Sequence, residues 1–509
     1  MLYPRYFVRR PLARYSLLLL FSFTTFSSCF TTASELSVTL DQIALAENTE
    51  AKFFLLPSTA VSNAVLVLIE YHKTEERDLS MYSWGNKWTL DLNLRLDPDI
   101  QFFDIARIGA RNLLVAYKNP ALVVLDPETR KFEPLLTIGS FFKGESRDKV
   151  SKIEVFNDLN GDGLDDVMIS GFDGWQISMQ HRDGSFSTPV TIGPSPMMNL
   201  GSNRYVAFTA ADAYFLDHNN DGFKDLAFRA DGEFLIHHQN PEGSYSRSPV
   251  AFDLGIDGIS DNGDLTLSLG DEADNEKNEE KILSGFEDLN GDNVADLLIQ
   301  AFEVDGLFGT KTRIDVHFGD LDSKGELTFP STPDSVILSK GIQFGADRQD
   351  IDGNGTTEMM VVSINISLGT IIRALIAGTV SLDTGIYQMA ENLYPPKPNL
   401  TRKVTATFDF STGETSIPAI IIADVTGDGL KDLLVQENAE TVGIFPGDGS
   451  SKVFSDRAIS VPLTLPTWLP GVREVVQAED LDGDKREELV MLVKIEEGPS
   501  RIVTVHFHE

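Results

Sequence analysis

Six short segments of the chain place oxygen-bearing side chains at the same spacing. Loop positions 1, 3, 5 and 9 carry Asp, Asn, Glu or Thr, and position 6 is Gly in four copies. Calcium prefers about six to eight oxygen ligands, which a tight loop supplies from alternate side chains and a backbone carbonyl. The pattern therefore predicts six Ca²⁺ loops, with the candidate ligands Asp158, Asn160, Asp162, Asp166, Asp217, Asn219, Asp221, Asp225, Asp288, Asn290, Asp292, Asp296, Asp350, Asp352, Asn354, Glu358, Asp424, Thr426, Asp428, Asp432, Asp480, Asp482, Asp484 and Glu488.

The residues after each loop exclude an EF-hand. An EF-hand loop ends in a bidentate Glu at position 12 and is flanked by helices. Position 12 is apolar here in every copy, namely Ile169, Phe228, Ile299, Val361, Val435 and Met491. Short apolar runs such as Val167–Ile169 follow the loops, which is typical of strands buried on both faces. Each loop is therefore expected to join two strands.

The segments between the loops predict the architecture. Successive loops begin 56 to 74 residues apart. In the first unit, apolar strands are expected over residues 153–156, 167–169, 176–180 and 189–192. Four strands per unit of about sixty residues describe a propeller blade. The expected fold is all-β.

These loops and strands resemble the FG-GAP/VCBS repeat family, whose blades build propellers related to the integrin alpha-chain head. The resemblance covers roughly residues 100–500, although the Gly-Ala-Pro of the family's name follows none of the buried strands. It implies that the six loops bind calcium. The implication is weakest for the loop of Asp480, where Lys485 replaces the turn glycine; Asn293 is a milder departure because Asn tolerates left-handed backbone geometry.

Two further units without acidic loops bring the expected count to eight blades, with seven blades as the alternative. They are expected over residues 52–92 and 101–136, where Arg107 and Arg111 would repel a cation. Only two strands follow the last loop. A ring needs closure, because open sheet edges promote aggregation. Residues 37–40 can supply the missing strand, so residues 36–509 are predicted to form one propeller.

The first 33 residues have the order of a secretory signal. Four arginines precede the apolar stretch Leu17–Phe26, and small residues follow it. The stretch is too short for a transmembrane helix, which needs about 20 residues. Cys29, the sole cysteine, is a candidate lipid anchor of a bacterial lipoprotein, with cleavage near Ala33 as the alternative. The sequence predicts export to the envelope, the cell surface or the medium.

Charge and motif content limit the function. The formal net charge is −35, which disfavours nucleic acid as a partner. The chain contains no HExxH or GxSxG motif and its eight histidines are scattered, so we predict no catalytic residue. The favoured function is the binding of a protein or a surface glycan. The alternative is a polysaccharide lyase, which the acidic chain disfavours because no basic cluster follows residue 14.

Three features are candidate docking places. Residues 256–280 and 392–416 are expected to be insertions between strands, and long loops on a rigid scaffold often carry function. The third is a single sugar site near Tyr82, Trp84 and Trp88, for which packing is the competing interpretation.

Overall fold

The computed structural model describes most of residues 36–508. The described part omits residues 47–48, 59–62, 73–75, 127, 143–149, 201–205, 231, 261–277, 305–310, 366, 410–413, 439, 450–451, 469–474 and 495–498. The predicted signal, Cys29 and most of the 256–280 insertion therefore lie outside the described residues.

The first four blades each contain four antiparallel strands. Blade 1 comprises β2 (Glu50–Leu56), β3 (Val65–Tyr71), β4 (Arg77–Trp84) and β5 (Trp88–Arg95). Blade 2 comprises β6 (Phe102–Ile108), β7 (Arg111–Lys118), β8 (Ala121–Asp126) and β9 (Lys131–Thr137), with the short β10 (Ser151–Lys152) parallel to β6. Blade 3 comprises β11 (Phe156–Asn157), β12 (Asp166–Gly171), β13 (Gly174–Ser178) and β14 (Val190–Ile192). Blade 4 comprises β17 (Ala213–Leu216), β18 (Asp225–Ala230), β19 (Glu233–His237) and β20 (Val250–Phe252).

The other four blades follow the same order, with additions in two of them. Blade 5 comprises β21 (Asn278–Glu287), β22 (Asp296–Val304), β23 (Lys311–His317) and β26 (Ser335–Lys340), and carries the hairpin β24 (Asp320–Leu321) and β25 (Leu327–Thr328). Blade 6 comprises β27 (Ile342–Gln349), β28 (Glu358–Ile364), β29 (Thr379–Tyr387) and β30 (Leu400–Asp409), extended by β31 (Glu414–Pro418) and β36 (Thr467–Trp468). Blade 7 comprises β32 (Ile421–Ala423), β33 (Asp432–Asn438), β34 (Thr441–Phe445) and β35 (Ile459–Val461). Blade 8 comprises β37 (Val476–Glu479), β38 (Glu488–Val493), β39 (Arg501–His508) and β1 (Ser37–Ala44).

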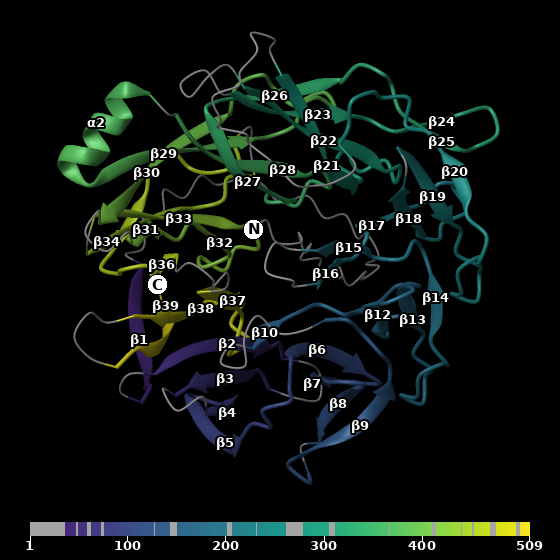
Figure 1. The fold of residues 1–509 in the computed structure, drawn as a ribbon. Helices are drawn as coiled ribbons and strands as arrows, with labels where there is room; N and C mark the ends of the chain where they lie inside the picture. Colours follow the sequence, from purple (N-terminus) through teal and green to yellow (C-terminus); the bar gives the residue numbers. More distant parts are fainter. Residues whose placement is uncertain are drawn as a thin grey trace, which may run out of the picture.

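The eight blades form a ring in which the first strand of each blade lies nearest the centre (Figure 1). This arrangement confirms the eight-bladed, all-β expectation. The last blade contains strands from both ends of the chain: β1 pairs antiparallel with β39, from Ser37 opposite His508 to Ala44 opposite Arg501.

The core consists of eight apolar clusters, one between each pair of neighbouring blades. In blade 8, β38 is almost entirely buried because both of its faces pack against other blades. The cluster that joins blade 8 to blade 1 contains Val490, Ile502, Phe53 and Leu66. Apolar packing therefore runs around the whole ring, including the junction of the chain ends.

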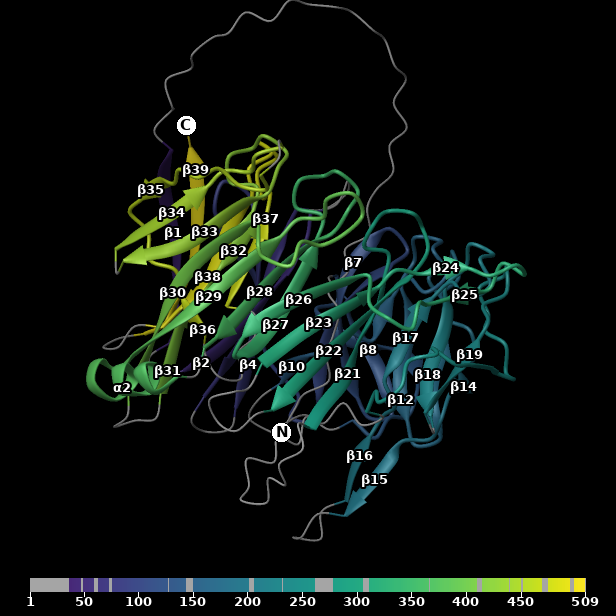
Figure 2. The same cartoon turned by 90° about the horizontal axis from the view of Figure 1, so that it is seen from above.

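The two faces of the ring differ. The acidic loops join the first and second strands of their blades and lie on one face, which we call the loop face. Because the strands alternate in direction, connections between second and third strands and between blades lie on the opposite face. That face carries helix α2 (Leu368–Ala377) and the hairpin of β15 (Met197–Leu200) and β16 (Val206–Thr209), on the lower side in Figure 2.

The expectation of a long insertion over residues 392–416 is wrong in most of its length. Residues 400–409 form β30, the fourth strand of blade 6, and β31 begins at Glu414. Charged residues in this segment and the prolines before it gave it the composition of a loop. Pairing with β29 nevertheless makes it a strand, since Ile386 lies opposite Leu400 and Thr379 opposite Thr407.

Candidate functional site

In every acidic loop, the aspartate at position 1 accepts hydrogen bonds from backbone N–H groups of the same loop. In blade 3, Asp158 Oδ2 accepts the backbone N–H of Gly163 at 2.9 Å, and Oδ1 accepts that of Asp162 at 3.1 Å. The hydrogen bond from position 6 to position 1 recurs in the other five loops, at Asp217, Asp288, Asp350, Asp424 and Asp480. The six loops therefore share one local conformation.

Positions 4 and 6 have left-handed backbone in all six loops. Glycine adopts this conformation without strain, as at Gly163 with φ of 84°. Asn293 at position 6 has φ of 67° and Lys485 has φ of 77°. The turn of the sixth loop thus persists without glycine, at a cost of about 1 kcal/mol. That loop also contains a second cation, because Arg486 Nη1 donates to Asp484 Oδ2 at 3.1 Å.

The position 9 carboxylates are built into the fold. Asp166 is fully buried. Its Oδ2 accepts the N–H of Leu159 at 3.2 Å and its Oδ1 accepts that of Gln180 at 2.7 Å. The bond to position 2 recurs at Asp225, Asp296, Glu358, Asp432 and Glu488, all of them buried. This side chain therefore fixes the loop to the strands, a role that the spacing alone does not indicate.

Burial makes the charged form of these carboxylates costly. Desolvation is the largest cause that raises the pKa of Asp166, Asp296 and Glu358 to about 7, and the carboxylates at loop positions 1 and 5, or 1 and 3 for Glu358, contribute to the rise. The backbone hydrogen bonds oppose the shift. At neutral pH a bound cation would offset both causes of the rise.

The donor set fits calcium. Two loop oxygens, Asn219 Oδ1 and Glu358 Oε1, are buried and have no hydrogen-bond partner, and a hard cation would satisfy them. Carboxylate oxygens of Asp350, Asp352 and Glu358 lie within 4.8 Å of one another. When bound, calcium would neutralise loop carboxylates that otherwise repel one another. The role of each of the 24 residues as a ligand stays a prediction.

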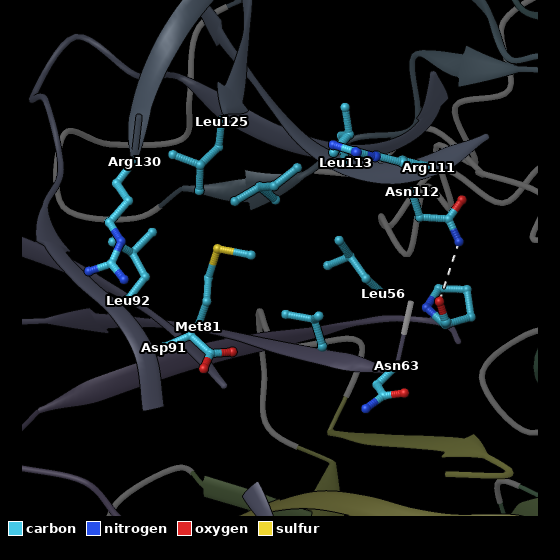
Figure 3. A pocket seen from close by; sticks show the side chains of 13 residues that line it. Leu56, Asn63, Met81, Asp91, Leu92, Arg111, Asn112, Leu113, Leu125 and Arg130 are labelled. Atoms are coloured by element: carbon cyan, nitrogen blue, oxygen red, sulfur yellow. Dashed lines mark hydrogen bonds between the residues drawn. The ribbon is translucent and has the colours of Figure 1, made fainter. Parts of the chain in front are cut away.

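A pocket of about 430 Å³ lies between blades 1 and 2, the two blades without acidic loops (Figure 3). Leu56, Leu114 and Leu125 are buried residues of its lining, and Met81 projects into its middle. Its remaining lining residues are Pro57, Asn63, Val65, Asp91, Leu92, Arg111, Asn112, Leu113 and Arg130. It opens toward the loop face, since Leu56 ends β2 and Arg111 begins β7.

Two exposed arginines flank this pocket in a strongly acidic protein. Arg111 and Arg130 are 19 residues apart in the chain, so no basic run marks them in the sequence. The turn between β8 and β9 brings Arg130 to the pocket that Arg111 enters from β7. Neither guanidinium forms an ion pair with a described residue. The sequence signal that could have found them is their position at the start of β7 and immediately before β9, the second and fourth strands of one blade.

The tryptophans near residue 84 are packing residues. Trp84 is 5% exposed and contacts Trp88 edge to face, with ring centroids 4.9 Å apart. Its other neighbour is His506 of blade 8, stacked at 5.2 Å. Because Trp84 sits between blades 8 and 1, its face is not available to a sugar.

Within the described residues, we find no helix with the length and apolar character that crossing a bilayer requires.

Fold and loops together define an eight-bladed β-propeller with repeated acidic turns. The pattern of the FG-GAP-like repeat family matches residues 158–228, which span the first two acidic loops. The FG-GAP-like repeat that the sequence predicted is thus confirmed over these residues, within a β-propeller.

No curated protein matches the chain. Among solved structures, it is similar to an Agrocybe aegerita lectin described as recognising non-reducing terminal N-acetylglucosamine, with 15% identity, a TM-score of 0.38, and coverage of 75% of this chain and 87% of the lectin. It is also similar to the V. cholerae biofilm matrix protein Bap1, with 13% identity, a TM-score of 0.36, and coverage of 91% and 88%. Similarity at this level says nothing about a ligand of this chain.

Proposed function

We propose that the chain is an exported, calcium-stabilised β-propeller that binds another protein at the cell envelope or surface. The pocket between blades 1 and 2 carries this proposal, because it combines an apolar floor with two arginines at its rim. The signal-like order of residues 1–33 and loops suited to calcium support an extracytoplasmic location, where weak calcium sites fill.

The pocket lining favours a peptide segment over a sugar. None of its 13 lining residues is aromatic, whereas sugars usually pack their apolar face on a ring. Met81 and the surrounding leucines instead suit an aliphatic or aromatic side chain, since methionine adapts to irregular apolar surfaces. The guanidinium groups of Arg111 and Arg130 suit a neighbouring carboxylate. The proposed ligand is therefore an acidic segment of a partner protein that contains an apolar anchor.

Charge reversal at the rim tests this assignment. Arg111→Glu combined with Arg130→Glu should weaken binding of an apolar and acidic peptide library, displayed in calcium buffer, by at least tenfold, because two attractive pairs become repulsive. Arg182→Glu changes the charge of an exposed residue away from the pocket and should leave binding unchanged.

Three results would contradict the proposal: equal peptide binding by the double variant, binding of a glycan array in place of peptides, or cleavage of uronate polymers by the wild-type chain. The last two would support the glycan-binding and lyase alternatives respectively.

A further inference from the structure

The third strand of each blade places one residue opposite the position 9 carboxylate. Continuing each strand register by one residue identifies it as Met179, His238, Phe318, Gln388, Pro446 and His506 in blades 3 to 8. Two blades thus bring an imidazole to an otherwise oxygen-lined loop. In blade 4 a second imidazole joins it, because position 2 of that loop is His218.

We propose that His218, His238 and Asp225 form a binding site for a zinc-class divalent transition metal. His218 Nδ1 lies 3.3 Å from His238 Nε2, and His238 Nε2 lies 3.9 Å from Asp225 Oδ2. One ligand atom from each of the three residues lies within 4.8 Å of the others. Two nitrogens that each bind zinc at about 2.0–2.1 Å in a tetrahedron are roughly 3.3 Å apart. The nitrogen pair already has this separation, and the carboxylate needs only a small approach.

The surrounding residues hold His218 and Asp225 in place and leave His238 partly exposed to solvent. His218 is 5% exposed and packs edge to face on Phe252, with centroids 4.8 Å apart. Its carbonyl accepts the N–H of Leu327, from the β24–β25 hairpin of blade 5, at 2.9 Å. Asp225 is fully buried, whereas the side chain of His238 is 30% exposed and gives an ion access from solvent.

Electrostatics suit a cation here. Glu326, Asp217 and Asp322 place negative charges near His218. Imidazole nitrogen favours zinc, nickel or copper, whereas carboxylate oxygens alone favour calcium. Blade 4 therefore differs in metal preference from the oxygen-only loops.

Blade 8 provides an internal comparison. His506 Nδ1 lies 3.5 Å from Glu488 Oε1, and its Nε2 lies 3.4 Å from Asp41 Oδ2. The metal-ligating group at this loop contains one imidazole instead of two. Because each ring nitrogen of His506 lies near a carboxylate and no second imidazole joins it, we expect the zinc ion in blade 4.

Titration of the full chain with zinc in calcium-saturated buffer tests the site. Because Asp225 also belongs to an acidic loop, zinc must then compete with calcium for its carboxylate. Wild type should bind one equivalent with a rise in melting temperature, and cobalt should give the absorption bands of a tetrahedral site. His218→Gln and His238→Gln should each lower zinc affinity at least tenfold. His181→Gln removes an exposed imidazole from blade 3 and should change neither affinity nor melting temperature.

Absence of stoichiometric zinc binding in calcium buffer would overturn the proposal. Equal zinc binding by wild type and both blade 4 variants would also overturn it. Zinc would then bind in the acidic loops, and the contact between His218 and His238 would be a hydrogen bond without a metal. Circular dichroism will show whether each variant folds. If one variant does not fold, the zinc affinity of the other variant and the wild-type cobalt spectrum still test the proposal.

Discussion

At the scale of single residues, the oxygen-bearing side chains of each acidic loop have different structural roles. Asp158 at position 1 accepts backbone N–H groups of its own loop, whereas Asp166 at position 9 connects the loop to two strands. The sixth loop keeps the same bonds but contains Lys485 and Arg486 beside its carboxylates. The loops should therefore be alike in backbone hydrogen bonding and unlike in calcium affinity.

Alanine at position 1 should separate these two contributions. Asp158→Ala and Asp480→Ala each remove an acceptor of two N–H groups. In about 1 mM calcium, a site with Kd near 10⁻⁴ M adds roughly 1.4 kcal/mol. We expect Asp158→Ala to lower the free energy of unfolding by about that much more than Asp480→Ala, measured by urea unfolding. In excess chelator the two variants should become equal; a difference that persists there would rule out calcium as its cause.

At the scale of elements, β1 is the part of the ring on which closure depends. It covers the edge of β39 over its whole length, from Ser37 to Ala44. Without it, β39 would become an exposed strand edge next to the cluster of Val503, Val505 and Phe507. Exposed edges of this kind also invite pairing between molecules.

Deleting residues 34–45 should therefore destabilise the entire propeller. We expect a loss of at least about 4 kcal/mol, from several interstrand hydrogen bonds at about 1 kcal/mol each, together with concentration-dependent aggregation. Thermal unfolding and light scattering measure both effects. Removal of residues 1–33 alone is the matched control, because β1 remains, and it should leave melting unchanged. Identical melting of both truncations would show that the ring does not rely on β1.

At the scale of the whole molecule, metal and protons compete for the same buried groups. In the metal-free ring, three position 9 carboxyls have a pKa of about 7, namely Asp166, Asp296 and Glu358. In the unfolded chain such groups titrate near pH 4. Between these values the folded state binds more protons than the unfolded state, so the free energy of unfolding falls as the pH rises.

Calorimetry with and without calcium should reveal this competition. The chelated protein is expected to melt at a higher temperature at pH 5 than at pH 7.5. Calcium binds the deprotonated carboxylates, so it should raise the melting temperature much more at pH 7.5 than at pH 5. A calcium effect of the same size at both pH values would contradict the assignment of these groups to metal sites.

The sequence by itself determined the features that depend on local spacing. Oxygen side chains at positions 1, 3, 5 and 9, followed by an apolar strand, are a local pattern, and its six copies identify six of the eight blades. The other two were expected from the order of their apolar strands, with seven blades as the alternative. Local conformation follows because Asp158 and its counterparts bond to backbone groups within a few residues.

Only the tertiary structure decided what depends on contacts between distant segments. Pairing with β29 made residues 400–409 a strand despite their loop-like composition. The packing of blade 1 on blade 2 created the pocket that Arg111 and Arg130 share. Strand register placed His238 beside His218, 20 residues away. Side chains meet at these places because the ring brings strands and blades together. The local spacing of residues does not predict which residues of distant segments will contact each other.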